Sequence, residues 1–100
     1  VKFHIGLTYS TTTEQIKTIV ADIQEMINNH EKTNQEGKVR FQEFGASSLD
    51  ILILYYVNSP KWEDLIDVKE DINYKIMDIV KKHDSDFAFP STSVYLHQNN

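Results

Sequence analysis

The chain contains two hydrophobic periods. Over residues 1–9 every second side chain is apolar, which is typical of a strand with one buried face. Over residues 16–27 and 62–80 apolar side chains recur every three or four positions, which predicts two amphipathic helices. Thr11 and Glu14 have the spacing of a capping box and predict the start of the first helix. The residues expected on the buried face of the second helix are Trp62, Leu65, Ile66, Ile72, Ile76, Ile79 and Val80.

Two further strands are expected between the helices. Residues 39–44 form a short strand, and residues 49–57 form a longer one that is apolar on both faces. Pro60 stops that strand because proline has no amide proton, and residues 87–89 can close the sheet as a short edge strand. The order β-α-β-β-α-β is that of an α+β ferredoxin-like sandwich, in which two helices cover one face of an antiparallel sheet. We therefore predict one domain over residues 1–90.

The third predicted strand has more apolar surface than the two helices can cover. One of its faces carries Leu49, Ile51, Ile53, Tyr55 and Val57. Its other face carries Leu52, Leu54 and Tyr56, each of which would contribute about 1.5–3 kcal/mol if removed from water. Clustered apolar surface usually marks an interface. We expect another domain or subunit to cover this second face.

Composition excludes several kinds of function. The 100 residues carry a net charge of −5 without a basic cluster, which argues against binding nucleic acid or anionic lipid. The absence of cysteine removes disulfides, thiol catalysis and thiolate metal sites. No apolar run approaches the roughly 18 residues of a membrane helix, so we expect these residues to be soluble. The chain opens inside a strand, as an excised domain would.

Histidines and carboxylates are the candidate metal ligands. The histidines are His4, His30, His83 and His97. No two of them share a helical turn, and a histidine at a helix end also interacts favourably with terminal carbonyls. The carboxylates that crowd the start of the second helix are Glu63, Asp64, Asp67, Glu70 and Asp71. They complement the helix dipole, so we predict neither a metal site nor a cofactor.

Catalytic patterns are weak. Ser47, Ser48 and Asp50 could form a hydrolase triad with a histidine, but the serine elbow and the oxyanion loop are missing. The three glycines are too far apart to cradle a phosphate. The segment from Gly45 to Ser48 has a simpler interpretation as a tight hairpin turn in which glycine supplies unusual backbone angles. We predict that the chain is not an enzyme and has no small-molecule substrate.

Three segments resemble the C-terminal cytoplasmic domain of the small-conductance mechanosensitive ion channel (MscS) family. They are Ile5–Thr11, Phe44–Leu49 and Phe87–Leu96, and they occur in the family's order. The resemblance implies a vestibule-forming domain of a channel that releases ions and small solutes under membrane tension, as in osmotic downshock. It also implies a homoheptamer on the cytoplasmic side of the bacterial inner membrane. Membrane helices and a β-rich domain would precede this domain in the same chain.

The resemblance assigns residues 91–100 a separate role. In the family, the matching strand of each subunit pairs with its neighbours in a small barrel. The residues that we expect at the subunit interface are Leu52, Leu54, Tyr56, Gly45, Ala46, Ser47, Pro90, Val94, Tyr95 and Leu96. The alternative is a ferredoxin-like regulatory or metal-binding domain of a cation transporter, which the histidines would serve.

Overall fold

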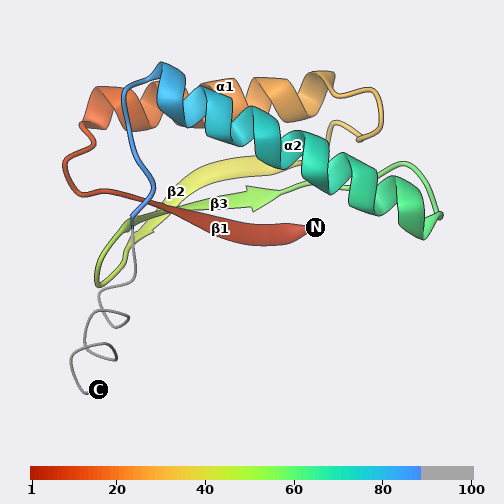
Figure 1. Ribbon diagram of the computed structural model, residues 1–100, viewed down its shortest axis with the longest axis horizontal. Helices are drawn as coiled ribbons and strands as arrows, with labels where there is room; N and C mark the ends of the chain where they lie inside the picture. Colours follow the sequence, from red (N-terminus) through yellow and green to blue (C-terminus); the bar gives the residue numbers. More distant parts are fainter. Residues whose placement is uncertain (89–100) are drawn as a thin grey trace, which may run out of the picture.

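The computed structural model describes residues 1–88 and arranges them as a sheet covered on one side by two helices (Figure 1). The elements are β1 (Lys2–Leu7), α1 (Thr13–Asn29), β2 (Lys38–Phe44), β3 (Leu49–Leu54) and α2 (Trp62–Lys82). The three strands are antiparallel in the order β1-β3-β2. The predicted α+β arrangement, with both helices on one face of an antiparallel sheet, is confirmed.

The core lies between the sheet and the helices. Ile51 and Ile53 of the central strand β3 have no exposed surface, and Tyr55, just beyond the strand, is equally buried. From α1, side chains at helical spacing complete this layer, and the four that are buried are Ile16, Ile19, Ile23 and Ile27. The prediction of which β3 face would be buried is therefore correct.

A bulge in β2 changes which of its side chains share one side of the sheet. Its register shifts between Phe41 and Glu43, so Phe41 and Phe44 reach the same side of the sheet despite being three residues apart. Their rings pack edge to face with centroids 5.1 Å apart. The Gln24 side chain of α1 accepts a hydrogen bond from the Val39 amide at 2.9 Å. This contact occupies part of the open edge of β2 and ties the strand to α1.

Two predicted boundaries are wrong by a small margin. The capping box of α1 is formed by Thr12 and Gln15, because the Gln15 amide donates to Thr12 Oγ1 at 3.2 Å and the Thr12 amide donates to Gln15 Oε1 at 2.7 Å. The third strand ends at Leu54 and not at Val57. Beyond Leu54 the chain keeps single contacts with its neighbours: Tyr55 exchanges two backbone hydrogen bonds with Val1, at 2.8 and 3.0 Å, and Val57 forms an isolated bridge with Thr33.

The buried face of α2 agrees with the prediction only in part. Ile72, Ile76 and Val80 are buried as predicted, and Val68, which was not predicted, is the fourth buried residue. Trp62 is 71% exposed and Ile66 is 40% exposed, so their assignment to the buried face is wrong. At 3.6 residues per turn, Trp62 and Ile66 point roughly 60° and roughly 100° away from the middle of the buried series. The sequence thus carries a second apolar series beside the buried one on α2.

After α2 the chain returns to the edge of the sheet beside β1. Asp84 adopts a left-handed conformation with φ of 57°, and the Ser85 amide donates to the Val80 carbonyl at 3.1 Å, which closes the helix. Phe87 then forms an antiparallel bridge with Leu7. The predicted edge strand is thus represented by one bridge within the described residues, and Phe89 lies outside them.

Candidate subunit interface

The second face of β3 is not covered by either helix (Figure 1). Leu52 and Leu54 are half-buried, and Tyr56 is 46% exposed, whereas Ile51 and Ile53 have no exposed surface. These exposed apolar side chains come from consecutive positions of one strand face and its extension. They form a continuous apolar stripe that none of the described elements covers.

Positive charge flanks this stripe. The rows across the sheet are Lys2–Leu54–Lys38 and His4–Leu52–Arg40. The stripe of Leu52, Leu54 and Tyr56 together with these flanking residues is called the open sheet face below. Lys2, Lys38 and Arg40 are exposed, and within residues 1–88 none of them makes an ion pair. The open sheet face therefore has an apolar centre and a basic rim, although the chain as a whole is acidic.

Two polar contacts shape the rim. The His4 ring hydrogen-bonds the side chain of Gln42, which lies on the other side of the central strand. Arg40 donates to the Val39 carbonyl at 2.8 Å and approaches Gln24 Oε1 at 3.4 Å, which places its guanidinium at the β2 edge. The basic rim thus extends to the edge of the sheet.

The turn between β2 and β3 depends on small residues. The Gly45 amide donates to the Ser48 carbonyl at 2.7 Å, and the Tyr9 hydroxyl donates to the Gly45 carbonyl. No glycine of the described chain has a positive φ, so the predicted unusual backbone angle at Gly45 is wrong. Glycine relieves crowding there, because a Cβ atom would lie 3.0 Å from the Ser48 carbonyl oxygen and 2.8 Å from a carboxylate oxygen of Asp50.

The remaining predicted interface positions are distributed between the turn and the tail. Ala46 is exposed and Ser47 is half-buried in the turn. The positions that lie outside the described residues are Pro90, Val94, Tyr95 and Leu96.

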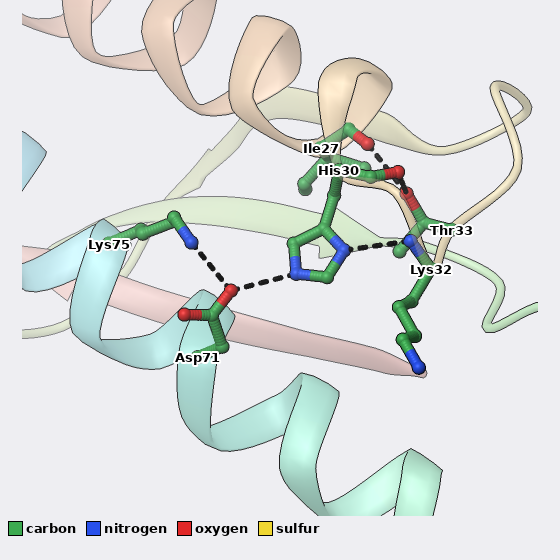
Figure 2. Close-up of polar contacts among 6 residues, drawn as sticks. All are labelled: Ile27, His30, Lys32, Thr33, Asp71 and Lys75. Carbon is green, nitrogen blue, oxygen red and sulfur yellow. Dashed lines mark hydrogen bonds and ion pairs between the residues drawn. The ribbon is translucent and has the colours of Figure 1, made fainter.

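His30, which follows the last turn of α1, ties this helix to α2 (Figure 2). Its Nε2 atom lies 2.8 Å from Asp71 Oδ2, and the Lys32 amide donates to its Nδ1 atom at 3.1 Å. Because Nδ1 accepts a hydrogen bond, the proton of a neutral His30 ring resides on Nε2 and is donated to Asp71. Lys75 donates to the same Asp71 oxygen at 2.6 Å.

A second tie joins the same helices at their other ends. His83, which follows α2, places Nε2 2.6 Å from Asp22 Oδ2 of α1, and Lys82 lies 3.9 Å from the same oxygen. Each helix therefore ends in a histidine that binds a carboxylate of the other helix. Neither role was predicted, because the sequence pattern gives no indication of which side chains meet between two helices.

The candidate metal ligands do not converge. His4, His30 and His83 lie at three separate sites, and His97 lies outside the described residues. Residues 1–88 hold no group of three or more metal-ligating side chains in position to bind an ion. At the start of α2, Asp64 accepts a hydrogen bond from Ser59 Oγ at 2.6 Å.

The tie at Asp71 predicts a small, pH-dependent contribution to stability. The hydrogen bonds from Lys75 and His30 lower the pKa of Asp71 below its ordinary value of 3.8. The contribution is therefore present above about pH 4 and disappears as pH falls through the lowered pKa. We expect Asp71→Asn to reduce the free energy of unfolding by less than about 1 kcal/mol at pH 7, because the site is exposed to solvent.

Urea unfolding at pH 7 and at about pH 3 would measure this effect. The difference in unfolding free energy between the wild type and Asp71→Asn should be smaller at about pH 3 than at pH 7. Asp67→Asn is the control, because Asp67 is an exposed carboxylate without an ion pair within residues 1–88. It should leave the unfolding free energy unchanged at both pH values. A difference for Asp71→Asn that grew in acid would contradict the assignment.

A family model distinguishes the channel from the transporter interpretation. Residues 1–87 match the family described as "Mechanosensitive ion channel MscS, C-terminal". The chain belongs to the MscS family. The resemblance of the three sequence segments to this family is thereby confirmed, and the cation-transporter alternative receives no support.

Similar MscS proteins occur in several organisms. An uncharacterized MscS family protein of Aquifex aeolicus is 46% identical over 98% of this chain, which covers 27% of that protein. The small-conductance mechanosensitive channel MscMJ of Methanocaldococcus jannaschii is 35% identical over 96% of the chain, again covering 27% of the relative. The low conductance mechanosensitive channel YnaI of Escherichia coli is 35% identical over 92% of the chain. The chain thus spans about a quarter of the length of these relatives.

A solved structure shares the fold. The cryo-EM structure of Arabidopsis thaliana MSL1 A320V superposes with a TM-score of 0.78 over 90% of this chain and 35% of its own, at 17% sequence identity. Within the described part of this MscS chain, neither α1 nor α2 has the length and apolarity needed to cross a bilayer. The relatives that carry a functional name are channels and not enzymes.

Proposed function

We propose that these residues form the vestibule domain of a mechanosensitive channel that releases ions and small solutes when membrane tension rises. The domain lies on the cytoplasmic side of the bacterial inner membrane, below a β-rich domain and the membrane helices of the same polypeptide. Seven copies assemble into a ring. The match of residues 1–87 to the C-terminal domain of the MscS family supports this proposal.

Residues 1–90 correspond in this proposal to a ferredoxin-like sandwich. The sheet order β1-β3-β2 and the bridge between Leu7 and Phe87 support it, because they put the chain after α2 at the free edge of β1. The Thr8 amide donates to the Asp86 carbonyl at 3.0 Å, and the Ala88 amide donates to the Gly6 carbonyl at 2.9 Å. These bonds are those expected where a fourth antiparallel strand begins.

The open sheet face is the observation that supports assembly into an oligomer. A sheet face with two half-buried leucines and an exposed tyrosine is costly to leave in water, and burial of such a stripe stabilises an oligomer. MscS family channels are oligomeric. The proposal therefore assigns Leu52, Leu54 and Tyr56 to contacts between subunits, with the Gly45–Ser47 turn at the margin of the contact.

The tail supplies a second contact between subunits. In the proposal, residues 91–100 pair with their counterparts in neighbouring subunits as strands of a barrel. Deletion of residues 91–100 from the full-length channel should then lower the fraction of complete rings, while the deletion should hardly change the unfolding of the 100-residue domain. Native mass measurement of the detergent-extracted channel and thermal unfolding of the domain test the two effects separately.

Equal losses of assembly and of domain stability would place the tail in the domain core and contradict the barrel assignment.

Channel function itself is tested by osmotic downshock of bacteria that lack their own mechanosensitive channels. Expression of the full-length channel should restore survival and tension-activated currents in membrane patches. Normal expression without either effect would contradict the proposed function.

A further inference from the structure

The outer face of α2 carries a second exposed apolar series. Its members are Trp62, Ile66, Tyr74 and Met77, which are between 40% and 71% exposed. They follow one another at intervals of four, eight and three residues, so at 3.6 residues per turn they spread over roughly one third of the helix circumference, beside the buried residues. This series is called the outer stripe of α2. Exposed apolar side chains that gather on one side of a helix mark a candidate contact surface.

Acidic side chains accompany the outer stripe. Glu63, Asp67 and Glu70 are exposed on the same side, and none makes an ion pair among residues 1–88. Lys69 lies on the other side of the outer stripe from these carboxylates, and Lys81 lies near the C-terminal end of the helix. The side chains that border the N-terminal half of the outer stripe therefore have a net negative charge.

The open sheet face has the complementary character. Its leucines are flanked by the unpaired cations Lys2, Lys38 and Arg40, whereas its two carboxylates, Asp50 and Glu43, lie together in the row nearest the hairpin turn. Side chains on one strand face repeat at roughly 6.8 Å, and helix residues four apart repeat at roughly 6 Å. An α2 ridge can therefore lie along β3 with its apolar side chains in contact with Leu52 and Leu54.

We propose that the outer stripe of α2 of one subunit packs on the open sheet face of the next. The two surfaces belong to different layers of the domain, because α2 lies on one side of the sheet and the open sheet face is the other side (Figure 1). A contact between two different surfaces of identical subunits is heterologous and can repeat around a closed ring. The inference rests on the proposed assembly and specifies which surfaces form it. Trp62, the first residue of α2 and the most exposed residue of the outer stripe, is the aromatic anchor at one end of this contact.

Disulfide cross-linking tests the proposed pair of surfaces, since the 100 residues contain no cysteine. Leu54→Cys and Ile66→Cys are introduced into separately tagged copies of a cysteine-free full-length channel, which are expressed together and oxidised in the membrane. Cross-linked dimers should contain one copy of each variant. Neither variant expressed alone should cross-link, and Leu54→Cys combined with Glu25→Cys on the exposed side of α1 should not do so either.

The failures are distinguishable. Self-linking of Leu54→Cys would show that two open sheet faces meet, which overturns the heterologous contact. Intact rings without a cross-link between positions 54 and 66 would show that another domain covers the open sheet face, and the inference would fail while the proposed function survives. A channel that forms no rings in native mass measurements would instead contradict the proposed assembly.

Charge reversal provides an independent test. Lys2→Glu with Lys38→Glu should lower the ring-forming fraction at least about tenfold, because like charges would then face each other across the contact. Adding Glu63→Lys and Glu70→Lys to the same chain should restore most of it, since the four exchanged positions would again join opposite charges. Failure of the fourfold variant to recover, with the domain's thermal unfolding unchanged, would overturn the proposed pairing.

Discussion

Substitution of Gly37 by alanine should reduce the free energy of unfolding by about 1–3 kcal/mol, because the added methyl group overpacks a closed site. Gly37 is buried immediately before β2. A Cβ atom there would lie 2.7 Å from the Leu54 carbonyl oxygen and 3.1 Å from Cγ2 of Ile27. The nearer atom belongs to the backbone of the central strand, so no rotamer change relieves the contact. The melting temperature should fall by about 4–8 °C for each kcal/mol lost.

A second glycine provides the matched comparison. At Gly6 the added methyl group would meet Cβ and Oγ of Ser48 at 2.8 and 2.9 Å, which are side-chain atoms. Gly6→Ala should therefore be rescued by Ser48→Gly, whereas Gly37→Ala has no such remedy from truncating a neighbour. Thermal unfolding of the three variants measures both effects. Wild-type stability in Gly37→Ala would show that β2 can move away from β3 without loss.

Hydrophobic periodicity was sufficient to predict the arrangement of the helices and strands. The alternating residues of β1 and the four-residue repeats of α1 and α2 identify these elements because each buries one face. The length of β3 could not be predicted in this way. Its apolar run continues to Val57, but the regular pairing with β1 and β2 ends at Leu54, and isolated contacts of Tyr55 with Val1 and of Val57 with Thr33 follow.

The second series on α2 shows why burial is harder to predict than helix formation. Trp62 and Ile66 have the spacing of a core face, and only the position of the sheet shows that Val68 points inward while they do not. A helix with two apolar sides is ambiguous until one side has a partner. The same ambiguity is informative after the fold is known, because the unused side becomes a candidate contact.

The open sheet face was predictable in its apolar part and not in its charged part. Alternation along the third strand placed Leu52 and Leu54 away from the helices. The basic rim depends on register, which brings Lys2 and Lys38 from distant parts of the chain to either side of Leu54. Register follows from pairing among three strands and was not contained in the pattern of any one of them.

Removal of the Tyr55 hydroxyl group should stabilise the protein. The Tyr55 side chain has no exposed surface, its ring packs edge to face with Phe3 at 6.4 Å, and its hydroxyl has no hydrogen-bond partner within residues 1–88. A buried hydroxyl without a partner costs about 1–3 kcal/mol, and Tyr55→Phe removes that cost while keeping the ring. The melting temperature should rise by about 4–8 °C for each kcal/mol gained.

The neighbouring tyrosine is the control. Tyr56 is 46% exposed on the open sheet face, so Tyr56→Phe should change the free energy of unfolding of the isolated domain by less than about 0.5 kcal/mol. Chemical unfolding gives the unfolding free energies of both variants and the wild type. It shows whether the gain comes from the burial of the Tyr55 hydroxyl group or from any loss of a tyrosine hydroxyl. A loss of stability in Tyr55→Phe would mean that the hydroxyl group has a partner, and the interpretation of this site would be wrong.

Alkaline pH should enlarge the advantage of Tyr55→Phe. Burial raises the pKa of Tyr55 from 10.0 to about 12, so between these values the unfolded chain releases the phenolic proton while the folded chain retains it. The unfolded state then binds fewer protons than the folded state, and the stability of the wild type falls as pH rises. Phenylalanine has no such proton. The difference in unfolding free energy between variant and wild type should therefore grow from about pH 9 to about pH 11, and a constant difference would show that Tyr55 ionises as readily in the folded protein as in the unfolded chain.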